Sequence, residues 1–241
     1  MVRFFAAPSE ISGGTIQLGA ADAAHIKSLR LSPKETFIVC DGDGTDYICR
    51  LGERSGDPTA EIDGSRPSRG EPSINCDVYI AFAKGDRLEY AVQKSVELGA
   101  RGVILFPSER CVSIPGDVNK KTARLQRIAL ETAKQCGRGR IPKVTGENSL
   151  KSAVEQAAKA EAPLFFYECE EEKRLKQTLE QHWAESTTSI MTGPEGGFEP
   201  HEAEYAQSAG MHIVTLGPRI LRCETAPVAA LAAIMYHTGN I

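Results

Sequence analysis

The 241-residue sequence has no long hydrophobic run, only 6% aromatic residues and no paired-cysteine motif. No apolar stretch approaches the roughly 20 residues of a membrane helix, and the opening residues MVRFFAAPSE lack a signal-peptide core. The seven cysteines are scattered without a CxxC pair, which argues against a disulfide framework and a zinc site. We therefore expect a cytoplasmic protein that binds neither a membrane nor a metal.

The two common glycine fingerprints for nucleotide phosphates are also missing. Neither GxxxxGK[ST] nor GxGxxG occurs, so a kinase-like or dinucleotide-dependent enzyme is disfavoured. With 41% apolar residues, the chain can nevertheless bury a substantial core. These absences leave a globular protein that does not bind its ligand through a phosphate loop.

Two loops rich in glycine and proline are the most informative feature that is present. Residues 191–198 read MTGPEGGF and residues 216–226 read LGPRILRCETA, and each segment follows a short apolar run and precedes an expected helix. Open parallel sheets bind ligands at such loops. Glu195 would repel a phosphate but suits a ribose or a cationic group, which favours an adenosine without phosphates. Either loop alone could be only a tight turn.

The first 63 residues predict a small β domain. Short β-rich runs are separated by Gly, Asp and Pro clusters, with a hairpin turn expected at residues 41–44. The expected strands are 4–5, 15–18, 36–40, 45–51 and 59–62. The polar segment 64–73 has no apolar periodicity and predicts a linker, with a domain boundary near residue 70.

From residue 74 onward, expected strands and helices alternate. This rhythm predicts an α/β domain with a mostly parallel sheet and helices on both faces. Asp86 and Glu89 are expected to form a capping box, and Pro227 to open the C-terminal helix. The acidic run 168–172 reads as the solvated start of another helix.

Positive charge gathers in the middle of the chain. Residues 73–143 contain 13 Lys/Arg against 7 Asp/Glu, although the whole chain has a net charge of -4. Part of this charge crowds one expected helix and the loop after it: Lys120, Lys121, Arg124, Arg127, Lys134, Arg138, Arg140 and Lys143. Such a patch favours contact with an RNA backbone, and a solvated helix face is the alternative.

The two glycine loops resemble the signature loops of the SPOUT methyltransferases. Within that superfamily they are similar to the enzymes that methylate N3 of a uridine in small-subunit (16S) ribosomal RNA. Further segments stand in the order of that family: HIKSLRL at 25–31, KGDR at 84–87, QKSVELG at 93–99, SER at 108–110 and QCGR at 135–138. The resemblance covers nearly the whole chain and departs at Ser95, where the family pattern has threonine.

This resemblance implies a fold and an activity. The expected architecture is a PUA-like, RNA-binding β-barrel in residues 1–70 and a SPOUT domain with a C-terminal trefoil knot in residues 74–241. The implied cofactor is S-adenosylmethionine, the implied substrate is small-subunit rRNA or the assembled 30S subunit, and the implied assembly is a homodimer. A SPOUT enzyme with another target atom, or a non-catalytic RNA-binding assembly factor, remains an alternative.

The resemblance also implies site residues. We expect the cofactor to contact Met191, Thr192, Gly193, Pro194, Glu195, Gly196, Leu216, Gly217, Arg219, Ile220, Leu221, Thr225 and Ala226. We expect RNA contacts from His25, Arg30, Lys84, Arg87, Lys134, Arg138 and Arg140.

Catalysis must manage the proton on N3 of uracil and the charge on the flanking carbonyl oxygens. Arg222 and Arg110 suit the charge, whereas Glu224 and Glu97 are the carboxylates that could take the proton. The sequence does not choose between them. Cys223 is expected to pack beside the pocket, because attack by a ring nitrogen needs no covalent adduct.

Overall fold

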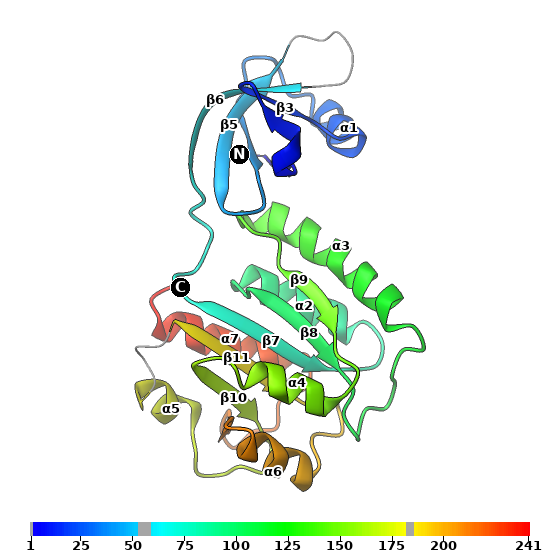
Figure 1. Ribbon diagram of the computed structural model, residues 1–241, viewed down its shortest axis with the longest axis vertical. Helices are drawn as coiled ribbons and strands as arrows, with labels where there is room; N and C mark the ends of the chain where they lie inside the picture. Colours follow the sequence, from blue (N-terminus) through cyan, green and yellow to red (C-terminus); the bar gives the residue numbers. More distant parts are fainter. Residues whose placement is uncertain (1, 53–58, 182–185) are drawn as a thin grey trace. The chain divides into compact units, whose positions relative to one another are not determined.

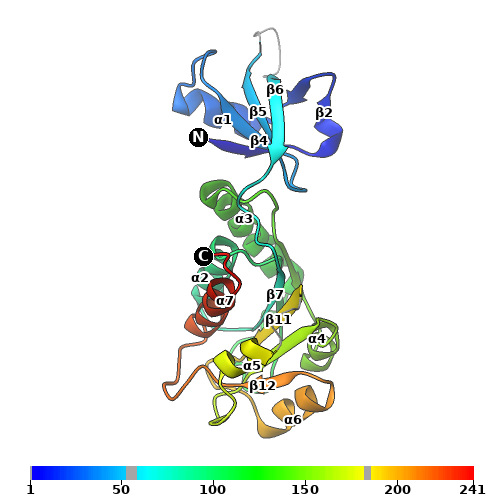
Figure 2. The same ribbon diagram turned by 90° about the vertical axis from the view of Figure 1, so that its left-hand side faces the viewer.

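The computed structural model describes residues 2–52, 59–181 and 186–241. The chain forms two compact units. The first contains residues 1–71 and 133–141, and the second contains residues 72–132 and 142–241. Figures 1 and 2 show the elements of each unit, coloured along the sequence.

Among its described residues, the first unit contains a six-stranded sheet and an α-helix between the third and fourth strands. The strands lie in the order β1-β4-β5-β6-β3-β2. β1 and β4 are parallel, whereas the remaining neighbours are antiparallel. The elements are β1 (Arg3–Phe5), a 3-10 turn η1 (Pro8–Glu10), β2 (Ile11–Ser12), β3 (Thr15–Gln17), α1 (Ala20–Leu29), β4 (Phe37–Cys40), β5 (Thr45–Leu51) and β6 (Thr59–Pro67). Each of the expected strands is present.

The hairpin expected at residues 41–44 is confirmed. The Asp41 carboxylate accepts hydrogen bonds from the backbone N–H groups of Asp43 and Thr45, at 2.8 and 3.0 Å. Gly42 and Gly44 have φ values of +79° and +107°, which residues with a side chain rarely adopt. These hydrogen bonds hold the pKa of Asp41 below its ordinary value, although burial acts in the opposite direction.

Two expectations for this unit were wrong. Helix α1 was missed because it buries only Ile26 and therefore has no apolar stripe in the sequence. The segment expected to be a linker begins inside β6, which continues to Pro67 and pairs with Thr45. The end of β6 is polar, so backbone pairing rather than side-chain burial keeps it in the sheet.

A buried ion pair anchors residues 133–141 in the first unit. The Glu71 carboxylate accepts hydrogen bonds from Arg138 Nε and Nη2 at 2.8 and 2.9 Å, and from the backbone N–H groups of Gly139 and Arg140 at 2.8 and 3.0 Å. Arg138 is only 3% exposed. The Cys40 thiol also donates to the Gly139 carbonyl oxygen at 2.9 Å. The Glu71 carboxylate thus holds together two segments that are far apart in the sequence.

Glu71→Ala is expected to destabilise the first unit by about 3 kcal/mol or more, because the buried Arg138 charge loses its partner. Urea unfolding would measure the loss. The matched control is Asp63→Ala, which removes the exposed partner of Arg50 and should cost under about 1 kcal/mol. Equal losses in the two variants would contradict the anchoring role of Glu71.

The second unit is built on a six-stranded parallel sheet. The strand order is β12-β10-β11-β7-β8-β9. Helices α2 and α7 cover one face, and α4 and α6 cover the other (Figure 2). The elements are β7 (Asn75–Ala81), α2 (Arg87–Glu97), β8 (Gly102–Phe106), α3 (Val118–Cys136), β9 (Lys143–Gly146), α4 (Leu150–Ala157), β10 (Ala162–Phe166), α5 (Leu175–Gln181), β11 (Thr187–Thr192), α6 (Pro200–Ser208), β12 (His212–Val214) and α7 (Thr225–His237). The expected parallel α/β architecture is confirmed.

Helix boundaries differ from the sequence expectations. The Asp86 side chain makes no capping bond to the described residues, and Glu89 instead binds Arg124 at 2.9 Å, so the expected capping box is wrong. α7 begins at Thr225, two residues before Pro227. Proline is tolerated there because the first-turn N–H groups have no acceptor within the helix.

No helix in the part of the chain that the structure describes is long and apolar enough to cross a membrane. Within the same residues, no group of three or more His, Cys, Asp and Glu side chains could hold a metal ion.

Candidate functional site

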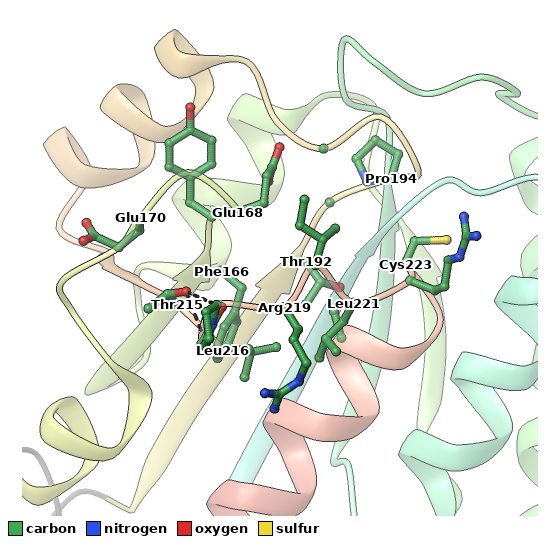
Figure 3. A pocket seen from close by; sticks show the side chains of 18 of the residues that line it. Phe166, Glu168, Glu170, Thr192, Pro194, Thr215, Leu216, Arg219, Leu221 and Cys223 are labelled. Carbon is green, nitrogen blue, oxygen red and sulfur yellow. Dashed lines mark hydrogen bonds between the residues drawn. The ribbon is translucent and has the colours of Figure 1, made fainter.

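A pocket of about 780 Å³ opens at the carboxyl ends of three neighbouring strands of the second unit (Figure 3). Its wall consists of the segment after β10, the segment after β11 and the segment after β12. In a parallel sheet, loops that leave adjacent strands at the same edge lie side by side. The strand order therefore explains why these three segments meet.

Both glycine loops line this pocket. The wall includes the expected cofactor residues Thr192, Gly193, Pro194, Glu195, Gly196, Leu216, Gly217, Arg219, Ile220, Leu221 and Ala226. Met191 and Thr225 are not among the described residues that line the pocket. Met191 is fully buried in the hydrophobic core, and Thr225 is the first residue of α7.

Sequence reasoning missed the third wall of the pocket. Phe166, Tyr167, Glu168, Glu170, Glu171 and Arg174 line it. The acidic run 168–172 was read as the start of a helix, but the helix begins only at Leu175. The Glu170 carboxylate accepts hydrogen bonds from the N–H groups of Glu172 and Lys173, which lowers its pKa. The sequence did contain one indication of this role: the acidic run directly follows an expected strand, as both glycine loops do.

The loop after β11 and the loop after β10 approach closely at Gly197. Gly197 has φ of +71°, and the Glu168 carboxylate occupies the space where a side chain would begin. Glu168 Oε1 accepts a hydrogen bond from the Phe198 N–H at 3.0 Å. The Phe198 ring packs against Phe165 of β10, with ring centroids 4.3 Å apart. The positive φ favours glycine at this position, and a side chain there would displace the Glu168 carboxylate from its hydrogen bond to Phe198.

Gly197→Ala is expected to distort the pocket wall, because the methyl group overlaps Glu168. The Kd for S-adenosylmethionine, the expected cofactor, should rise at least tenfold, which corresponds to about 1.4 kcal/mol of binding free energy. Isothermal titration calorimetry would measure the change. Gly210→Ala is the matched control, because Gly210 has φ of +97° but open space around it. If the two variants bound ligand equally well, the contact with Glu168 would not determine the pocket.

Glu195 is held at the rim of the pocket by cationic and backbone donors. Its Oε1 accepts a hydrogen bond from the Lys84 N–H at 2.8 Å and a short one from the Arg87 guanidinium. Burial alone would raise the pKa of Glu195, but these donors outweigh it and the pKa lies below its ordinary value. Glu195 is therefore a carboxylate at neutral pH.

The four catalytic candidates lie in different surroundings. Arg222 lines the pocket, whereas Glu224, two residues further, is not among the described lining residues and lies 3.7 Å from Arg87. Arg110 Nε donates to Glu199 at 2.6 Å and its Nη1 donates to the Gly196 carbonyl at 3.1 Å, so it braces the glycine loop from outside. Glu97 lies in the last turn of α2, bound to Lys94 at 2.8 Å, and is not on the described wall.

Cys223 is a protonated thiol. Burial raises its pKa to about 12, and the adjacent Glu224 carboxylate, 3.2 Å from Sγ, acts in the same direction. Only a thiolate is an effective nucleophile. Cys223 therefore packs against the pocket wall, and this environment disfavours a covalent mechanism through it.

The expected RNA-binding residues are not equally accessible. His25, Arg30, Lys84 and Arg140 are exposed. Arg138 is buried against Glu71 and is not available to RNA, which corrects that expectation. Two further cations are engaged in ion pairs, Lys134 with Asp22 at 3.1 Å and Arg87 with Glu195.

Comparison with known proteins places the chain in a family. A family model described as an RNA methyltransferase domain matches residues 70–235. The ribosomal RNA small subunit methyltransferase E of Mesomycoplasma hyopneumoniae is 34% identical over 86% of this chain and 88% of its own length. The chain belongs to the ribosomal RNA small subunit methyltransferase E family. The Bacillus subtilis protein of the same name is 33% identical over 93% of this chain and 91% of its own.

A solved structure extends the similarity to the fold. The crystal structure of a ribosomal RNA small subunit methyltransferase E from Neisseria gonorrhoeae, bound to S-adenosyl methionine, is 32% identical to this chain. The TM-score is 0.85, and the match covers 98% of this chain and 97% of that one. The α/β architecture found here is thus that of a methyltransferase family.

Proposed function

We propose that this chain transfers a methyl group from S-adenosylmethionine to N3 of a uridine in 16S ribosomal RNA, in the cytoplasm. The observation that carries the proposal is the single pocket walled by both glycine loops. Membership of an rRNA methyltransferase family and a relative that binds S-adenosyl methionine support it. The choice of N3 rests on the resemblance of the loops to uridine-N3 enzymes.

The residues of the pocket fit this cofactor. A volume of about 780 Å³ lies in the range of sites for small ligands. Carboxylates of Glu168, Glu170, Glu171 and Glu195 on the wall suit a ligand that carries cationic groups and no phosphate. When bound, the cofactor supplies an electrophilic methyl group on a positively charged sulfur.

The chain's own residues would position and polarise the uracil ring. Arg222 at the pocket would stabilise negative charge on the uracil carbonyl oxygens. Glu224, two residues further, is the carboxylate that we propose for the N3 proton. We do not assign a chemical step to Arg110, which braces the first glycine loop, or to Glu97, which lies in α2 and in neither glycine loop. Most of the acceleration should come from alignment of the two reactants.

The deciding experiment supplies labelled S-adenosylmethionine and 30S subunits from cells lacking this enzyme. The expected product, after digestion of the RNA, is labelled N3-methyluridine, and Arg222→Ala should lower kcat about 100-fold by analogy with loss of an oxyanion donor. Free 16S rRNA in parallel would show whether the assembled subunit is needed. Label in another nucleoside would overturn the acceptor atom, and cofactor binding without transfer would favour the assembly-factor alternative.

We further propose that the first unit is a PUA-like barrel that contacts RNA. Its sheet has a separate core that includes Phe4, Ile16 and Phe37. Arg30 ends α1 with φ of +54°, and it is the only non-glycine residue with a positive φ among those described. Strain of this kind is typical of functional positions. Because Arg30 is exposed, its side chain is free of the packing that would otherwise explain the residue choice.

Arg30→Gly is expected to raise stability by about 1 kcal/mol, because glycine adopts this conformation without strain. At the same time, the affinity for RNA should fall, and the slope of log affinity against log salt concentration should decrease by about one. Filter binding at several salt concentrations and thermal unfolding would measure both effects. Lys34→Gln removes another exposed cation of the same unit as a control. Unchanged RNA affinity in Arg30→Gly would remove this residue from the interface.

We propose that the trefoil knot of the SPOUT family is present near the pocket. The Thr215 N–H donates to the Lys173 carbonyl at 2.9 Å, and the Leu175 N–H donates to the Thr215 carbonyl at 3.2 Å. The segment after β12 is therefore tied to the segment after β10 before the chain enters α7. A crystallographic backbone trace without the crossing would contradict the knot.

A homodimer through α7 and the loop before it is also proposed. Tyr236 on α7 is 77% exposed and Ile220 on the pocket loop is 86% exposed, so both side chains are available for burial against a second copy of the chain. Tyr236→Glu is expected to convert the dimer to a monomer, measured by light scattering. Val112→Glu, at another exposed apolar residue of the same unit, should leave the mass unchanged. A monomeric wild-type protein would contradict the dimer.

A further inference from the structure

Arg87 joins the two glycine loops through their carboxylates. It is the first residue of α2, and its Nη1 donates a short hydrogen bond to Glu195 Oε1 on the first loop. Its Nε lies 3.7 Å from Glu224 Oε2, at the end of the second loop. Glu195 also lines the pocket, whereas Arg87 is not among the described residues that line it. One guanidinium therefore contacts carboxylates from both glycine loops.

The charges around Arg87 favour this arrangement. Two carboxylates approach the guanidinium, and the backbone N–H of Lys84 supplies Glu195 with a further donor at 2.8 Å. The hydrogen bond that Arg87 donates to Glu195 is the main cause of the raised pKa of Arg87. The planar guanidinium can serve two acceptors at once, which the single ammonium of lysine does with less directional control.

We propose that Arg87 is a positioning residue that holds the two loops at the spacing required for cofactor binding. It acts through Glu195 and Glu224 and does not touch the cofactor. Preorganised loops bind more tightly because less conformational entropy is lost on association. The proposal rests on the proposed function for its consequence, but the loop spacing itself is a property of the free protein. It also gives the KGDR segment a role other than RNA contact.

The first experiment needs no ligand. Hydrogen exchange of the amides at 193–198 and 222–226 is compared in wild type, Arg87→Gln and Arg87→Lys full-length proteins. We expect faster exchange at both segments in Arg87→Gln, with a smaller effect in Arg87→Lys. Arg101→Gln is the matched control, because Arg101 binds Asp77 in the same unit, beyond the other end of α2, and is exposed. Unchanged exchange in Arg87→Gln overturns the proposal, whatever the cofactor.

The second experiment measures S-adenosylmethionine binding and turnover. Arg87→Gln is expected to raise the cofactor Kd about tenfold, because the two loops are no longer held in place before the cofactor binds. A lower kcat is expected as well, since Arg87 lies 3.7 Å from Glu224, the proposed base. Arg87→Lys should recover part of the affinity.

The outcomes separate this inference from the function on which it rests. Faster loop exchange with normal cofactor affinity would overturn the positioning role while leaving the methyltransferase proposal intact. Weaker RNA binding with unchanged exchange and cofactor affinity would return Arg87 to the RNA interface and also overturn it. Failure of the wild-type protein to bind the cofactor would instead contradict the proposed function.

Discussion

The position of β10 between β11 and β12 is the constraint on which the pocket depends. The three strands are consecutive in the chain, but the first of them is central among the three in space. Because all three are parallel, their carboxyl ends and the loops that follow lie at one edge. The pocket is therefore a consequence of strand order, and the side chains on the loops determine which ligand it accepts.

Close packing of these loops leaves little freedom at individual residues. Gly197 is constrained both by its left-handed backbone and by the carboxylate of Glu168. Glu168 in turn satisfies the N–H of Phe198, whose ring packs on β10. A substitution at one loop is thus felt by the other. Arg110 makes a second set of contacts with the first glycine loop, to the Gly196 carbonyl and to Glu199.

Basic residues within each unit serve two purposes that the sequence does not distinguish. Some cations form ion pairs within the protein: Arg87 pairs with Glu195 and Glu224, and Arg138 pairs with Glu71. Others, such as Arg222 and Arg30, remain exposed. A basic stretch in the sequence therefore overstates the surface that is available to RNA. Burial separates the two groups: Arg138 has the charge that an RNA phosphate needs but not the access.

The sequence by itself determined the strand and helix alternation after residue 74, the short strands before it, and the two glycine loops that line the pocket. These features have local causes: apolar periodicity, turn residues, and glycine where the backbone needs it. It also carried enough of the family pattern to identify an RNA methyltransferase. Helix α1 was not predicted, because an alanine-rich segment with one buried residue has no apolar periodicity.

Only the tertiary structure decided which distant residues meet. The acidic run after β10 became a pocket wall because that strand lies beside β11 and β12, an arrangement that local patterns do not encode. Glu71 reaches Arg138, and Arg87 reaches Glu195 and Glu224, across large separations in sequence. Composition gives each side chain a charge, but its partner depends on the path of the backbone, and the partner determines whether that charge binds RNA, braces a loop or faces a ligand.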